Sequence, residues 1–373
     1  MAIQPRDIYH GRRRRRGLII IILTVITAPV VTGVILFYSL QKYIVYDKDG
    51  LFLQLPLLAS REEITGGAGD DDRREGDAGP GFFAEIVTVI PSFDDVATDA
   101  GVGLKTVKGL FVPAGDITPD KLANYAAELE HAGVDSLALE MKPPGGRLAW
   151  ASEVPLALSY GTSSAEDLSE EIVSLKDKGI YLIAFVSCFA DELMATRNSH
   201  ISLKTAGAGA YADSDGKYWL DPYNRAVRNY IIDLTEELSA MGFDEIVLTD
   251  FRHPENIENM IYSLEMTVVP DVVFCISNNA VKIAEAFSGG SVRVSVLFES
   301  PVLRGLYENS GQDADLFFRV FDRVYCRPEQ EGFTNVSSSL RAKMKTGNFA
   351  ARFVPITPSD PGTESFVAEK GFG

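Results

Sequence analysis

Apolar and polar positions alternate along the chain from about Lys105 onward, and the pattern predicts repeated strand–helix units. Short apolar runs rich in β-branched residues are typical of buried parallel strands, and amphipathic segments between them are typical of covering helices. Eight runs predict strands: Val107–Val112, Ser136–Met141, Tyr181–Ser187, Glu245–Leu248, Val272–Ile276, Val292–Phe298, Arg323–Tyr325 and Ala351–Ile356. Helices are predicted over Thr118–His131 (with its cap), Ser164–Lys178, Arg225–Met241, Glu255–Met266, Asn278–Ala286, Asp313–Phe321 and Ser337–Lys345. This alternation over about 270 residues predicts a (β/α)8 TIM-like barrel, with a doubly wound open sheet as the alternative.

The N-terminal pattern is different and predicts a membrane anchor. Five arginines, Arg12–Arg16, precede an uncharged apolar run at 17–38. A helix of that length spans the ~30 Å hydrocarbon core of a bilayer, and the arginines favour a cytoplasmic N-terminus. We therefore expect a basic cytoplasmic tail (1–16), a single-pass transmembrane helix (17–38) and an extracytoplasmic C-terminal domain at the cell membrane. A cleaved signal peptide is the alternative, although its apolar region is normally only ~7–15 residues long.

Two further segments separate the predicted anchor from the barrel. The membrane-proximal segment 39–58 contains a short extended or hairpin piece around Asp49-Gly50. Residues 59–82 are rich in glycine and charge and cannot bury a core, so they predict a flexible linker. The acidic run Asp70–Asp72 is interpreted as solvated linker, since two arginines follow it directly. The barrel domain is assigned to 83–373.

Composition excludes several classes of function. The net charge of −17 argues against nucleic acid as a partner, because nucleic-acid binding needs basic surface. The chain has neither a P-loop nor a GxGxxG motif, so no nucleotide is predicted. Four scattered histidines and three cysteines without CxxC predict no metal site, disulfide framework or cofactor. Cys188, Cys275 and Cys326 are expected to be buried small hydrophobes, with a thiolate metal site as the alternative.

Candidate catalytic groups follow the predicted strands. The active sites of (β/α)8 barrels lie at the C-terminal ends of the strands, where this chain places Glu140, Asp250 and Glu299. A pair of carboxylates is the equipment of glycoside hydrolysis: one donates a proton to the leaving oxygen, and the other attacks or activates water. The alternative is that these carboxylates form ion pairs that hold the loops.

Other polar and aromatic residues near the same strand ends are candidates for substrate binding. An arginine beside a carboxylate keeps it ionised, and aromatic rings stack on sugars or simply cover the barrel rim. Lys142 follows the second predicted strand. A salt bridge from it to Glu140 or Asp250 is preferred over Schiff-base chemistry, because Pro143-Pro144 makes a rigid loop. The candidate set is Lys142, Trp150, Trp219, Tyr223, Arg252 and Arg327.

Several motifs point to a known family. Gly146–Ser152 (GRLAWAS), Trp219–Asn224 (WLDPYN) and Gly242–Ile246 (GFDEI) resemble a bacterial family named "putative glycoside hydrolase domain". Members of that family are TIM barrels, often membrane-anchored or secreted. The resemblance covers Lys105–Pro254 and implies hydrolysis of a polysaccharide.

The chain departs from that family at polar positions. The family usually continues GFDEI with a segment like QFDYIRFP, where this chain reads Val247–Pro254 (VLTDFRHP). The family aspartate therefore falls on Thr249, and Asp250 falls where a tyrosine is usual. Phe185 and Pro143 likewise replace a basic and an acidic residue. Since side chains alternate faces along a strand, this shift re-aims the carboxylate, unless a bulge lets Asp250 take over.

Two functions stay open from the sequence. One is a glycoside hydrolase that acts on a cell-envelope or extracellular polysaccharide, with Glu140 and Asp250 as acid and base or nucleophile. The other is a catalytically degenerate barrel that binds glycan or an envelope protein partner.

Overall fold

The computed structural model describes residues 44–47, 50–53, 100–207, 209–254, 260–264, 269, 271–299, 310–328, 333–344 and 347–369. The chain forms two compact units, 1–85 and 86–373. In the first unit, β1 (Ile44–Asp47) and β2 (Gly50–Leu53) pair as an antiparallel hairpin that brings Asp47 opposite Gly50, as the sequence predicts. The predicted anchor (17–38) and linker (59–82) lie outside the described residues. Across the part of the chain that the structure describes, every helix is too short or too polar to span a membrane.

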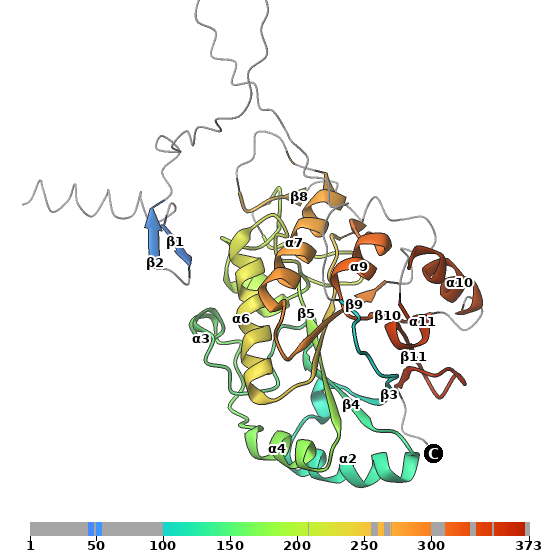
Figure 1. The fold of residues 1–373 in the computed structure, drawn as a ribbon. Coiled ribbons are helices and arrows are strands. Elements are labelled where there is room, and N and C mark those ends of the chain that lie inside the picture. Colours follow the sequence, from blue (N-terminus) through green and yellow to red (C-terminus); the bar gives the residue numbers. More distant parts are fainter. Residues whose placement is uncertain are drawn as a thin grey trace, which may run out of the picture. The chain divides into compact units, whose positions relative to one another are not determined.

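The second unit contains a closed barrel of parallel strands (Figure 1). Its strands are β3 (Lys108–Val112), β4 (Ser136–Lys142), β5 (Tyr181–Ser187), β7 (Glu245–Thr249), β9 (Arg293–Phe298), β10 (Val324–Cys326), β11 (Phe353–Thr357) and β12 (Phe366–Ala368). Neighbouring strands follow chain order, and β12 pairs with β3 to close the ring. The predicted (β/α)8 barrel is confirmed, and the open sheet is excluded because no strand of the ring has a free edge.

Helices occupy the segments between the strands. They are α2 (Pro119–Ala132), α3 (Pro155–Tyr160), α4 (Ser169–Asp177), α5 (Glu192–Arg197), α6 (Arg225–Met241), α7 (Val272–Phe287), α9 (Ala314–Val320), α10 (Phe333–Lys343), α11 (Phe349–Arg352) and the 3₁₀ turn η1 (Ala114–Asp116). Local chemistry sets several boundaries. Thr118 caps α2, whose first residue is a proline, and Gly133 ends it in the left-handed conformation. Asn224 and Gly242 bound α6 in the same way.

Three expectations about the elements need correction. The predicted strand Val272–Ile276 is the start of α7, because the Asp271 side chain accepts hydrogen bonds from the backbone amides of Val273 and Phe274 and caps a helix there. The eighth barrel strand is instead β12, which the sequence pattern missed. The predicted helix Glu255–Met266 is wrong where it is described, since Met260–Ile261 is the short strand β8, which pairs with β6 (Lys204–Thr205).

Side chains of the strands alternate between two buried layers. Ala138, Phe185, Val247, Leu297 and Tyr325 belong to the cluster inside the barrel, whereas their chain neighbours pack outward against the helices. Because side chains on a strand alternate, the residue two positions after an inward-facing residue also faces inward. Residues 140, 249, 299 and 327 stand in that relation to Ala138, Val247, Leu297 and Tyr325, so their side chains point towards the mouth of the barrel.

A buried charge network closes the barrel interior at the opposite, N-terminal end. Glu245 accepts hydrogen bonds from Ser295 Oγ (2.6 Å), Tyr325 OH (3.0 Å) and Tyr181 OH (3.0 Å), and it forms an ion pair with Arg323. Arg323 also donates to two backbone carbonyl oxygens. Both charged side chains are almost completely buried. The network satisfies each charge inside the barrel and leaves the C-terminal mouth as the open end.

Candidate active site at the mouth of the barrel

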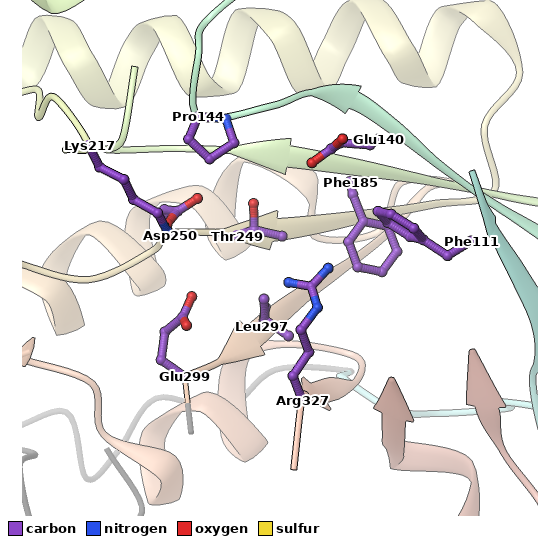
Figure 2. Close-up of a pocket in the computed structure, with 10 residues that line it drawn as sticks. All are labelled: Phe111, Glu140, Pro144, Phe185, Lys217, Thr249, Asp250, Leu297, Glu299 and Arg327. Atoms are coloured by element: carbon purple, nitrogen blue, oxygen red, sulfur yellow. The ribbon is translucent and has the colours of Figure 1, made fainter. Parts of the chain in front are cut away.

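A cavity of about 90 Å³ lies at the C-terminal ends of the strands (Figure 2). The three carboxylates predicted from the sequence all line it. The lining residues are Phe111, Glu140, Pro144, Phe185, Lys217, Thr249, Asp250, Leu297, Glu299 and Arg327. This volume holds a few water molecules or the reacting part of a ligand, since liquid water occupies about 30 Å³ per molecule.

Asp250 reaches the cavity through an unusual backbone conformation. Thr249 faces the barrel interior, so on a regular strand the next side chain would point away from it. Asp250 instead has φ 46°, the only positive φ of a non-glycine residue in the described chain, and this re-aims its side chain. Its Oδ1 lies 2.6 Å from Lys217 Nζ, and its Oδ2 accepts a 2.8 Å hydrogen bond from Ser187 Oγ. A bulge was the alternative by which Asp250 could take over, but β5 and β7 stay in register up to the pair Ser187–Thr249.

Glu299 enters the cavity from the end of β9, facing Asp250 (Figure 2). Burial raises the pKa of Glu299, and the negative charge of Asp250 raises it further. The positive charges of Arg252, Lys217 and Arg327 act in the opposite direction without reversing the shift. Glu299 is thus a carboxyl group with a raised pKa beside a carboxylate that is paired with a lysine.

Glu140 and Arg327 complete the charged lining. Oε2 of Glu140 accepts a 3.0 Å hydrogen bond from the Ala114 backbone amide, which ties the loop after β3 to β4. Arg327 donates from Nε to Glu369 at 2.9 Å and lies with its guanidinium carbon 5.7 Å from the Phe111 ring centre. Both groups border the cavity, and each also has a clear role in holding a loop.

Lys142 does not reach the cavity. Its side chain is 1% exposed, and its Nζ lies 2.9 Å from Asp191 Oδ2 and donates to the Ser187 carbonyl at 2.6 Å. The partners expected from the sequence were Glu140 and Asp250. A register shift in β4 between Glu140 and Lys142 separates these two neighbours, and only Glu140 lines the mouth. Lys142 therefore serves the packing of the loop after β5 rather than substrate binding.

The Asp191 carboxylate leads to a stability prediction. Gly146 has φ 83°, and a Cβ there would overlap Asp191 Oδ1, the atom that caps α5 through the Met194 amide. Gly146→Ala is expected to lower the free energy of unfolding by about 3 kcal/mol, from backbone strain and displacement of a carboxylate that also pairs with Lys142. Urea denaturation measures the loss. The matched control is Gly145→Ala, where a Cβ meets no atom within 4 Å; equal losses in both variants would contradict the assignment.

The predicted sugar-stacking aromatics also lie away from the cavity. Trp150 and Trp219 are buried, and each indole N–H donates to a carboxylate of the protein, at 2.8 and 2.9 Å. Tyr223 is half-buried against another tyrosine, with ring centres 4.9 Å apart. The aromatic side chains that line the cavity are Phe111 and Phe185. The three predicted residues therefore stabilise the rim, and nothing among the described residues places them against a ligand.

Arg252 and His253 lie next to Asp250 in the chain but do not line the cavity. The Arg252 guanidinium carbon lies 4.8 Å from the Trp219 ring centre, and its NH1 donates to the His253 carbonyl at 3.2 Å. Burial and the charge of Arg252 lower the pKa of His253 to about 4. Nδ1 of the neutral ring donates to the Pro254 carbonyl at 2.9 Å, and Nε2 accepts from Tyr262 at 3.3 Å. His253 is therefore a structural histidine, and Arg252 acts on Glu299 by charge.

A family model matches the part of the chain that runs from the first barrel strand to the fifth. The model described as "Putative glycosyl hydrolase domain" matches residues 109–296, which is half of the chain. The chain belongs to this family. No curated protein sequence matches the chain.

Solved structures resemble the chain only distantly. A hypothetical protein from Ruminiclostridium thermocellum is 22% identical with a TM-score of 0.45, over 50% of this chain and 96% of that one. The PgaB (BpsB) glycoside hydrolase domain from Bordetella bronchiseptica is 12% identical with a TM-score of 0.49, over 71% and 94% of the two chains. Likeness at this level carries no argument about activity, so the site is interpreted from its own geometry.

The motifs that carry the family resemblance have structural roles here. In GFDEI, Gly242 ends α6, the Asp244 carboxylate accepts from the Leu182 amide at 2.8 Å, and Glu245 forms the interior network. In WLDPYN, Asp221 accepts from the backbone and side chain of Ser263 at 2.6 and 2.7 Å. The described residues of these two motifs therefore stabilise the barrel and its rim.

Proposed function

We propose that this protein is a glycoside hydrolase that acts on a cell-envelope or extracellular polysaccharide. The observation that carries the proposal is the pair formed by Asp250 and Glu299 at the barrel mouth. Neighbours stabilise the charge of Asp250, while the pKa of Glu299 is raised by burial and by Asp250. A carboxylate held by an ion pair beside a second carboxyl group with a raised pKa is an arrangement that suits glycoside hydrolysis.

The proposed chemistry divides the roles between these two groups. Glu299 donates its proton to the glycosidic oxygen as the bond to the anomeric carbon breaks. Asp250 either attacks that carbon, to be displaced later by water, or takes a proton from the water that attacks it. The hydroxyl of water ends on the anomeric carbon in both routes. In the first route the Glu299 carboxylate takes the proton that water releases, which restores the acid. In the second route Asp250 takes that proton, and proton exchange with solvent restores both groups. The anomeric configuration of the first product, measured by NMR, distinguishes the two routes.

The membrane tether is part of the proposal and rests on the sequence pattern. Five arginines followed by the uncharged run 17–38 favour a single-pass anchor with the barrel outside the cytoplasm. An anchored barrel would sediment with the membrane fraction and be cut by protease added to spheroplasts. Recovery of the full chain in the cytosolic fraction would contradict the tether and would leave the proposed hydrolysis untested by this experiment.

The test of the activity uses the full-length chain in detergent micelles. We expect release of new reducing ends from a panel of bacterial envelope polysaccharides, with a bell-shaped dependence of kcat/KM on pH. The acid limb reports the group that acts as base or nucleophile, and the alkaline limb reports loss of the Glu299 proton. Absence of reducing ends across the panel and across pH would reject hydrolysis.

A second candidate function is non-catalytic glycan binding by the same mouth. Thr249 lies on the cavity wall at the position of the family aspartate, and both Asp250 oxygens already have partners. This candidate predicts saturable binding of a polysaccharide, measured by titration calorimetry, without any release of reducing ends.

A further inference from the structure

Lys217 reaches the cavity from outside the barrel, on the insert at 189–224 between β5 and α6. Its Nζ lies 2.6 Å from Asp250 Oδ1. The lysine side chain is 31% exposed, whereas that of Asp250 is 5% exposed. The ion pair thus joins a buried carboxylate to a cation at the edge of solvent, and it lies across the lining of the cavity (Figure 2).

The turn that carries Lys217 is closely hydrogen-bonded. The Asp213 amide donates to the Lys217 carbonyl, and an Asp213 carboxylate oxygen accepts from the Lys217 amide, both at 2.9 Å. Gly216 completes the turn with φ 79°. The second Asp213 oxygen accepts from Trp219 Nε1 at 2.9 Å, and the Trp219 ring stacks with Arg252. These hydrogen bonds fix the backbone of Lys217 within the turn at the rim of the barrel.

We propose that Lys217 is a positioning residue that holds Asp250 ionised and aimed into the cavity. This inference rests on the proposed function and adds to it a residue from the insert. A carboxylate that is taken out of water needs a compensating charge or donor. Ser187 supplies a neutral donor, and Lys217 is the cation in direct contact. Burial works to lower the pKa of Lys217, but the ion pair with Asp250 raises it overall, so the lysine stays charged.

Several other charged or titratable groups surround the pair and shape its response. They are Glu140 from β4, Cys188 from the end of β5, Arg252 from the loop after β7, Glu299 from β9 and Arg327 from β10. Removing Lys217 leaves Asp250 and Glu299 with one positive charge fewer. The two carboxyl groups should then bind protons more readily, and both titrations should move to higher pH.

The experiment compares wild type, Lys217→Met and Lys217→Arg as full-length chains in micelles. Carboxyl ¹³C NMR of Asp- and Glu-labelled protein follows the two groups, assigned with Asp250→Asn and Glu299→Gln. We expect both midpoints to rise in Lys217→Met, to return towards wild type in Lys217→Arg, and to stay unchanged in Lys204→Met, a control from the same insert. Unchanged midpoints in Lys217→Met, or no recovery with arginine, would overturn the proposal.

A kinetic measurement separates this inference from the proposed function. In an active enzyme, Lys217→Met should move the acid limb of kcat/KM to higher pH, and kcat should fall on the order of 10²-fold with little change in KM. A shifted titration in a protein that cleaves no glycan would uphold the role of Lys217 and reject hydrolysis. An active enzyme whose acid limb and carboxyl titrations are unchanged in Lys217→Met would uphold hydrolysis and reject the proposed role of Lys217.

Discussion

Asparagine in place of Asp250 is expected to lower kcat for glycan release on the order of 10⁴-fold, the loss typical of removing a central catalytic group. Asparagine has nearly the same shape and can still accept from Ser187, but it neither attacks the anomeric carbon nor takes a proton. Glu299→Gln should act similarly on substrates with poor leaving groups, because the amide cannot donate a proton to the leaving oxygen. Reducing-end assays at several pH values measure both effects.

The pH dependence gives these variants a signature that misfolding would not produce. The raised pKa of Glu299 means that its proton is present at low pH and is lost as pH rises through that pKa. Wild-type activity should therefore fall on the alkaline side, and this limb should disappear from the residual activity of Glu299→Gln. Asp215→Asn, an exposed carboxylate on the insert, is the matched control. Full activity in Asp250→Asn would exclude the proposed pair.

Glu245→Gln is expected to lower the free energy of unfolding by about 3–5 kcal/mol, because it leaves the buried Arg323 without its counter-charge. With the amide oxygen in the place of Oε1, Ser295 and Tyr325 keep their acceptor, whereas the amide nitrogen in the place of Oε2 faces Tyr181 and Arg323. The loss therefore measures the uncompensated guanidinium together with the lost acceptor. Urea denaturation followed by circular dichroism gives the value.

An exposed ion pair provides the contrast. Lys282 and Glu285 lie 2.8 Å apart on α7 with side chains 52% and 54% exposed, so Glu285→Gln should change stability by less than about 1 kcal/mol. Combining Glu245→Gln with Arg323→Met removes the stranded charge and should recover part of the loss. Similar small effects for Glu245→Gln and Glu285→Gln would show that the interior network contributes little.

The barrel could be predicted from the sequence because its strands are local patterns. Seven of its strands lie where β-branched apolar runs predicted them, such as Tyr181–Ser187 and Glu245–Thr249. The run Val272–Ile276 has the same composition, and only the Asp271 cap and the continuation to Phe287 make it a helix. The last strand, Phe366–Ala368, has only three residues, and pairing with β3 and β11 defines it.

The candidate site could be predicted only in part, for a similar reason. Glu140 lies near the end of a strand, and Glu299 and Arg327 directly follow strands, so strand direction together with alternation brings them to one mouth. Lys217 lies in a polar turn 33 residues from Asp250, and no local pattern distinguishes it from any exposed lysine. Trp150 and Trp219 fit a sugar-binding rim by position, but burial beneath the loops removes them from the cavity.

By itself, the sequence determined the parallel barrel, the end of the barrel at which carboxylates gather, and the family, since these depend on side-chain periodicity and short motifs. The tertiary structure decided which of those carboxylates form a pair. Asp250 has a left-handed backbone conformation, and its ion pair with Lys217 joins segments that lie far apart in the chain. The raised pKa of Glu299 likewise depends on burial and on the charges of four other residues from three segments of the chain. Such long-range electrostatics has no local signature in a sequence, because it exists only after the chain has folded.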